Sequence, residues 1–297
     1  MPQYRQGFIE SFNKDISGNF IFNETIGDII SRPIGTVQEN TSYAYRHKNS
    51  LFITVDAFKQ VTSDNPYLDR TNGAGGEGVV TCSVTGRHLN WFELILREAR
   101  KDKSIKHIFV QSHLPILQPV RKVVCSGQFM DFGEESEFWK LMKDYAVDVY
   151  FAGEVHANTA TKSNDSNLVQ VVSRGNMFNN FLKIQVSDNT IDISSYNEIG
   201  DAAKWNNNYA EHGRLTIDKS TSLTKITSSG ALKLLDRNAP LIHFNFENVV
   251  ALKSRQVLGM VHDDFDDKLV GDRITVRGVT STESMPNWGE FGRKYTF

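Results

Sequence analysis

Glu154 and His156 stand just after a mostly apolar run, "VDVYFA", which predicts a buried strand ending at Ala152. His113 follows another such run, "HIFV", in the same way. Polar residues gather wherever chains leave a sheet, so any one of these three could be an ordinary loop residue. Together they offer two imidazoles and a carboxylate, which are ligands that zinc, manganese and iron accept. The pattern therefore points to a metal site, provided that the two strands are neighbours.

Strands and helices are expected to alternate around these residues. In order, the patterns predict a strand pair within 41–58 turning at 47–50, a helix over 87–100, a strand over 107–110, a helix over 134–146, a strand over 147–152, and strands within 167–175 and 181–193. This alternation predicts an α/β fold whose late strands are antiparallel. In such sheets, ligands bind beyond the carboxyl ends of strands, and strands joined through one helix are often neighbours. His113 and Glu154 are therefore expected to lie close together.

The chain changes character after residue 196. Residues 196–212 are polar and rich in asparagine, which suits a linker or a surface loop, and the remainder has the short alternating runs of strands. We expect three segments: an α/β part over 1–196, a linker or β segment over 197–239, and a β-rich part over 240–297.

Composition excludes several classes of protein. The 297 residues include 33 Lys and Arg against 35 Asp and Glu, so the chain lacks the basic footprint that nucleic-acid binding requires. No apolar run approaches the ~20 residues of a membrane span, and the first residues lack the layout of a signal peptide. Cys82 and Cys125 are the only cysteines, which excludes a disulfide scaffold but allows one bridge, so the redox compartment stays open.

The order of these motifs resembles the second half of a calcineurin-like metallophosphoesterase. The resemblance lies in "LNWFELILREARKDKSIKHIFVQSHLPIL" and "FWKLMKDYAVDVYFAGEVHANT" and covers roughly residues 41–195. That family has a helix with a Trp-Leu-like centre, a strand ending in His followed closely by Pro, and a strand ending in Gly-His-x-His. "YAYRHKNSLFITVDAF" resembles the strand pair before that helix and places Asp56 near the site. The resemblance implies part of a four-layer α-β-β-α sandwich, followed by a β-rich C-terminal segment.

The resemblance also implies a ligand set. His113 corresponds to the family's lone metal-binding histidine, and His156 corresponds to the second histidine of Gly-His-x-His. Glu154 stands where the family has the first histidine; a carboxylate can replace imidazole, but its charge would shift the metal preference. The implied cofactors are divalent Zn, Mn or Fe ions, two in the complete enzyme. The implied activity is hydrolysis of a phosphate mono- or diester, in an extracellular or periplasmic setting.

The other ligand motifs of the family do not occur before His113. They are an Asp-x-His, a Gly-Asp-x-x-Asp with the bridging aspartate, and a Gly-Asn-His. A two-metal site holds its ions roughly 3.5–4 Å apart with ligands on both, which three residues cannot supply. We therefore expect the C-terminal part of a longer phosphoesterase, with no nameable catalytic residue and no activity in isolation. The alternative is a degenerate relative.

The C-terminal segment supports a different, non-catalytic interpretation. "PLIHFNFEN" resembles the first strand of a laminin-G or concanavalin-like lectin domain, although too few residues follow it for a whole domain. The chain would then be a binding module whose β-rich tail binds glycans on an α/β scaffold. The acidic run "HDDFDDK" (262–268) lacks the glycine and glutamate of an EF-hand loop and is interpreted as a solvated turn.

The remaining histidines stand in no motif. We expect them to be ordinary surface or edge residues: His47, His88, His107, His212, His243 and His262. Among them, His107 is expected at the opposite end of its strand from His113.

Overall fold

The structure is a computed structural model that describes residues 2–58, 83–117, 130, 132–154, 157–175, 179–199, 208–235, 256–257 and 276–277. Its helices are α1 (Pro2–Phe12), α2 (Gly86–Lys101), the 3₁₀ helix η2 (Gly133–Glu135) and α3 (Glu137–Asp144). Its strands are β1 (Thr25–Ile26), β2 (Ile29–Ile30), β3 (Tyr43–His47), β4 (Ser50–Thr54), β5 (His107–Gln111), β6 (Val149–Ala152), β7 (Thr159–Lys162), β8 (Val169–Val172), β9 (Asn180–Val186), β10 (Thr190–Glu198), β11 (Tyr209–Asp218), β12 (Lys225–Gly230), β13 (Gln256–Val257) and β14 (Val276–Arg277).

A mixed six-stranded sheet forms the centre of the described fold, in the order β3-β4-β5-β6-β8-β7. β4, β5, β6 and β8 run parallel, and β3 and β7 pair antiparallel at the two edges. Parallel neighbours need long crossover connections, and α2 and α3 lie within the first two of these crossovers. The carboxyl ends of four parallel strands consequently meet at one edge of the sheet.

A second sheet is antiparallel and follows the order β12-β11-β10-β9. The run 181–193, expected as one strand, is instead the β9–β10 hairpin, which turns at Ser187–Asn189. β11 and β12, from the segment expected as a linker or β segment, extend this sheet. β9 to β12 are therefore antiparallel, as the sequence predicts, whereas β8, from the run 167–175, pairs parallel with β6 in the central sheet.

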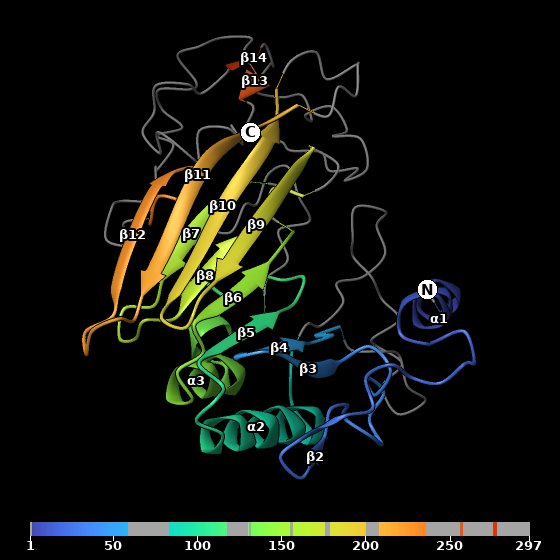
Figure 1. The fold of residues 1–297 in the computed structure, drawn as a ribbon. Helices are drawn as coiled ribbons and strands as arrows, with labels where there is room; N and C mark the ends of the chain where they lie inside the picture. The colour runs from blue at the N-terminus through green and yellow to red at the C-terminus, as the bar shows by residue number, and fades with distance from the viewer. Residues whose placement is uncertain are drawn as a thin grey trace.

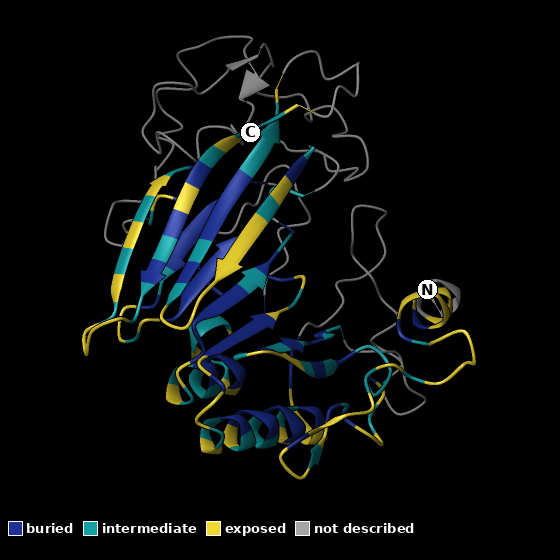
Figure 2. Cartoon of the chain, in the orientation of Figure 1, coloured by how far each residue is buried: buried dark blue, intermediate teal, exposed yellow. Residues whose placement is uncertain are grey.

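The described elements form three layers (Figure 1). α2 and α3 cover one face of the six-stranded sheet, and side chains such as Leu96, Trp139 and Val110 fill the core between them. The four-stranded sheet covers the other face, where Phe109 and Val171 pack against Ile193 and Leu215. Figure 2 shows β5, β6 and β8 mostly buried and β9 mostly exposed. The α/β class is confirmed, but within the described ranges no helix covers the outer face of the four-stranded sheet.

Local patterns account for most of these elements. In α2, Phe92, Ile95, Leu96 and Ala99 are fully buried at helical spacing, as predicted. β7 was not predicted, because "TATK" carries neither strong alternation nor large β-branched apolar residues. α1 was not predicted either. None of the described helices has both the length and the apolar composition that crossing a membrane requires.

Several sequence-based interpretations lie outside the described residues. They concern His156, Cys82, Cys125, the "HDDFDDK" run and the stretch resembling a lectin strand.

Candidate functional site

The strand register aligns polar residues at the carboxyl edge of the six-stranded sheet. Thr54 pairs with Gln111, Gln111 pairs with Phe151, and in the next pair of strands Ala152 faces Val172. Pairing continues past the strand ends, because the Gly153 N–H donates to the His113 carbonyl at 2.8 Å. His113 is thereby held opposite Gly153, directly before Glu154.

His113 and Glu154 are in direct contact at this edge. His113 Nε2 lies 2.8 Å from Glu154 Oε2; the imidazole side chain is 51% exposed and the carboxylate only 9%. An ionised carboxylate can only accept, so the ring donates from Nε2. Gly153 allows this approach, since a Cβ there would lie 3.3 Å from His113 Nδ1. The two side chains therefore form a polar contact that solvent reaches from the His113 side.

The backbone of Glu154 is strained. Its φ is +63°, in the left-handed region that disfavours every residue with a Cβ. Such conformations persist where surrounding structure enforces them, and they gather at functional sites. This turn directs Glu154 towards His113 on the neighbouring strand.

Asp56, expected near the site, lies beside His113 in register. Its Oδ2 accepts a hydrogen bond from Thr41 Oγ1 at 2.6 Å, and its Oδ1 accepts one from the Phe58 N–H at 3.1 Å. The Phe58 ring centroid lies 6.0 Å from that of His113. Asp56 therefore shapes the loop after β4, and both of its oxygens already have local donors.

The described residues bring two of the three expected ligands together. His156 lies outside them. Among the residues that the structure describes, no group of three or more His, Cys, Asp or Glu side chains is arranged to hold a metal ion. Zinc sites in enzymes use three protein ligands, so His113 and Glu154 alone fit a metal only in part.

The opposite edge of the same sheet holds a buried polar network. Asp148 precedes β6 and accepts from the Ile108 N–H at 2.9 Å and from Lys219 Nζ at 2.8 Å. His107 is fully buried, and its Nε2 donates to the Ser187 carbonyl at 2.8 Å. Burial lowers the pKa of His107, and the Lys219 ammonium lowers it further. Ser187 lies in the β9–β10 turn and Lys219 directly follows β11, so the network fastens the two sheets together.

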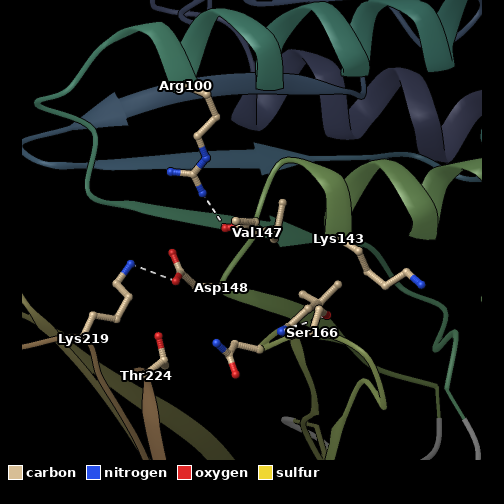
Figure 3. Close-up of a pocket in the computed structure, with 10 residues that line it drawn as sticks. Arg100, Lys143, Val147, Asp148, Ser166, Lys219 and Thr224 are labelled. Carbon is tan, nitrogen blue, oxygen red and sulfur yellow. Dashed lines mark hydrogen bonds and ion pairs between the residues drawn. The ribbon is translucent and has the colours of Figure 1, made fainter. Parts of the chain in front are cut away.

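A pocket of about 400 Å³ opens beside this network. Figure 3 shows Lys219 and Asp148 pointing towards one another at its wall. Arg100 and Lys143 also line it, from the last turns of α2 and α3. Arg100 donates to the carbonyls of Tyr145 and Ala146, and Lys143 pairs with Asp165, an ion pair that lowers the Asp165 pKa to about 2. Cations at helix C-termini balance the helix dipoles, so these charges stabilise the fold.

Two histidines expected to be ordinary surface or edge residues are buried. His107 is covered by the β9–β10 turn, and His88 is 4% exposed against Trp91 in the first turns of α2. Burial lowers the pKa of His88 to about 4. His107 does begin β5, at the opposite end from His113, as predicted. Sequence patterns gave no sign of Lys219, whose partner is far away in the chain.

Comparison with known proteins gives only distant similarity. No protein-family model matches the chain, and no curated protein matches it. A purple acid phosphatase, PPD1 from yellow lupin (Lupinus luteus) seeds, is 11% identical with a TM-score of 0.36. GAP50, the anchor in the inner membrane complex of Plasmodium, is 13% identical with a TM-score of 0.32.

The alignments are partial as well as weak. They cover 61% of this chain and 33% of the phosphatase chain, and 67% of this chain and 63% of the GAP50 chain. This chain thus spans less than two thirds of either one. With TM-scores this low, no functional conclusion rests on the matches.

Proposed function

We propose that this chain carries part of the metal site of a metal-dependent phosphoesterase, with His113, Glu154 and His156 as ligands of a divalent cation. The 2.8 Å contact between His113 Nε2 and Glu154 Oε2, where two neighbouring parallel strands end, carries the proposal. It places two suitable donors together at the edge where such sheets bind ligands. In this proposal, the ligand motifs that do not occur before His113 belong to a longer protein.

A bound dication would polarise a phosphoryl oxygen and lower the pKa of coordinated water. The residues of this chain would hold the ion and orient the ester. In the metal-free state, a proton on His113 Nε2 bridges to Glu154. Coordination through Nε2 displaces that proton, so metal binding should release protons and weaken in acid.

Calorimetric titration with Zn²⁺ and Mn²⁺ tests the ligand set. His113→Ala and His156→Ala should each lower affinity more than about 100-fold, because truncating a ligand costs more than the 10–100-fold typical of outer-shell changes. His47→Ala is the matched control: His47 is exposed at the amino edge and should leave affinity unchanged. Unchanged binding in both site variants would refute the proposal.

Glu154→Gln separates two roles of the carboxylate. Loss of affinity as severe as in His113→Ala assigns Glu154 to the ion itself. A loss of about 10-fold, with reduced proton release, assigns it to orienting the His113 ring.

Hydrolysis of p-nitrophenyl phosphate by the isolated chain should not exceed that of a boiled control with any added dication, since the bridging aspartate motif is absent from the sequence. Robust metal-dependent turnover would contradict the proposal that this chain carries only part of the metal site.

A further inference from the structure

One cation occupies the same edge as the candidate metal ligands. Asp56, His113, Glu154 and Arg174 each stand two residues beyond the end of a parallel strand: β4, β5, β6 and β8. Because Ala152 pairs with Val172, Glu154 and Arg174 occupy matched positions on neighbouring strands. Neighbouring strands lie about 4.8 Å apart, so the backbone of Arg174 stands beside that of Glu154 at this edge, and Arg174 adds a positive charge there.

The backbone of Arg174 is fixed on both sides. The preceding Ser173 N–H donates to the Ala152 carbonyl at 3.1 Å, which ties the end of β8 to the end of β6. The Arg174 N–H donates to Asn158 Oδ1 at 3.0 Å, and Asn158 is fully buried. After Arg174, the Gly175 N–H donates to Ser173 Oγ at 3.3 Å. These hydrogen bonds therefore hold the backbone of Arg174 at a defined position beside Glu154, where the residue is partly buried.

We propose that Arg174 binds the non-bridging oxygens of the phosphate group that the His113–Glu154 edge receives. This inference rests on the proposed function. A guanidinium presents a planar fork of N–H donors that matches a phosphate and stays charged at every physiological pH. A phosphate monoester is mostly dianionic near neutrality and a diester is a monoanion, whereas Glu154 and Asp56 make the edge acidic. A cation on the next strand offsets that repulsion and orients the ester at this edge.

Phosphate binding, measured separately from metal binding, tests the role of Arg174. The probe is inorganic phosphate, titrated by calorimetry and by ³¹P line broadening against the full chain, with and without saturating Zn²⁺. Arg174→Ala should weaken phosphate binding about 10–100-fold, the range expected for hydrogen bonds to a charged group. Arg174→Lys keeps the charge but loses the fork, so it should recover part of the loss. Zn²⁺ affinity and the thermal midpoint should stay within error of the parent in Arg174→Lys.

The matched control is Arg214→Ala. Arg214 is an exposed arginine on β11 that pairs with Glu211, away from the carboxyl edge. It should leave phosphate affinity unchanged.

The outcomes separate this inference from the proposed function. If Zn²⁺ does not bind but phosphate binding still depends on Arg174, the metal proposal fails and the anion site stands. If Zn²⁺ binds through His113 while phosphate affinity is the same in the parent and both Arg174 variants, Arg174 is not a phosphate ligand. An equal loss in Arg214→Ala, or no detectable phosphate binding by the parent under either condition, also overturns the inference.

Discussion

The two ends of β5 place histidine side chains in opposite environments. His107 begins the strand and is fully buried between two sheets, with Nε2 donating to Ser187. His113 follows the strand by two residues, is half exposed, and contacts a carboxylate that sits on a strained backbone. At the amino edge, loops of the second sheet close over the strand ends. At the carboxyl edge, four aligned strand ends present polar residues.

This difference shows why residue type alone could not separate structure from function. Both histidines stand beside an acid: Asp148 Oδ2 lies 4.0 Å from His107 Nδ1, and Glu154 Oε2 lies 2.8 Å from His113 Nε2. The two histidines differ in burial: the His107 side chain is fully buried, whereas that of His113 is half exposed. A buried acid that receives a backbone N–H and a lysine is a structural element, whereas an exposed imidazole paired with an acid can exchange its proton for a metal ion.

The strongest test of the comparison is Asp148→Ala. It should lower the free energy of unfolding by about 3–5 kcal/mol, because Lys219 and the Ile108 N–H lose their buried acceptor. Asp165→Ala is the control: Asp165 pairs with Lys143 at the surface, so its loss should lower the free energy of unfolding much less than the loss of Asp148 does. Urea unfolding of both variants measures the difference. Equal small losses would mean that the amino edge does not fasten the sheets.

The two histidines should separate in the same assay. His107→Ala should cost about 2–3 kcal/mol, because it leaves a cavity and removes the bond to Ser187. His113→Ala should stay within about 1 kcal/mol, because half of the ring is already in water. The reverse order of stability losses would contradict the roles assigned to the two edges.

Acid should weaken the fold through buried histidines. The folded pKa of His88 is about 4 and its ordinary value is 6.5, so between these values the unfolded chain binds a proton that the folded chain does not. Stability therefore falls as the pH drops through this window, by about 2 kcal/mol between pH 7.5 and pH 5 for His88 alone. The lowered pKa of His107 acts in the same direction. Urea unfolding of His88→Leu and of the parent at both pH values measures the effect, and an identical pH dependence would exclude His88 as its source.

The smallest expected effect concerns the strained turn at the carboxyl edge. Glu154→Gly and Glu154→Ala both remove the contact with His113, but only glycine adopts φ +63° without strain. The glycine variant should be more stable than the alanine variant by about 1 kcal/mol. Thermal unfolding of the pair isolates the backbone cost. If alanine is as stable as glycine, the turn stores no strain.

The sequence by itself determined the secondary structure of the centre and the chemistry available to it. Apolar spacing located α2, β5 and β6, and strand-end polarity selected His113 and Glu154. These features are local: a helical stripe or a polar residue after an apolar run can be read within a dozen residues. The order strand–helix–strand was enough to predict that the two residues would be neighbours.

Only the tertiary structure decided which polar residues face water and which strand-end residues lie beside one another across the sheet. His107 was expected to be an ordinary surface or edge residue, but it is fully buried and bonds to Ser187, which is far away in sequence. Arg174 stood in no motif, and only the pairing of Ala152 with Val172 places it beside Glu154. Burial and register depend on contacts between distant segments, and a one-residue change in pairing would move every strand-end residue to another position.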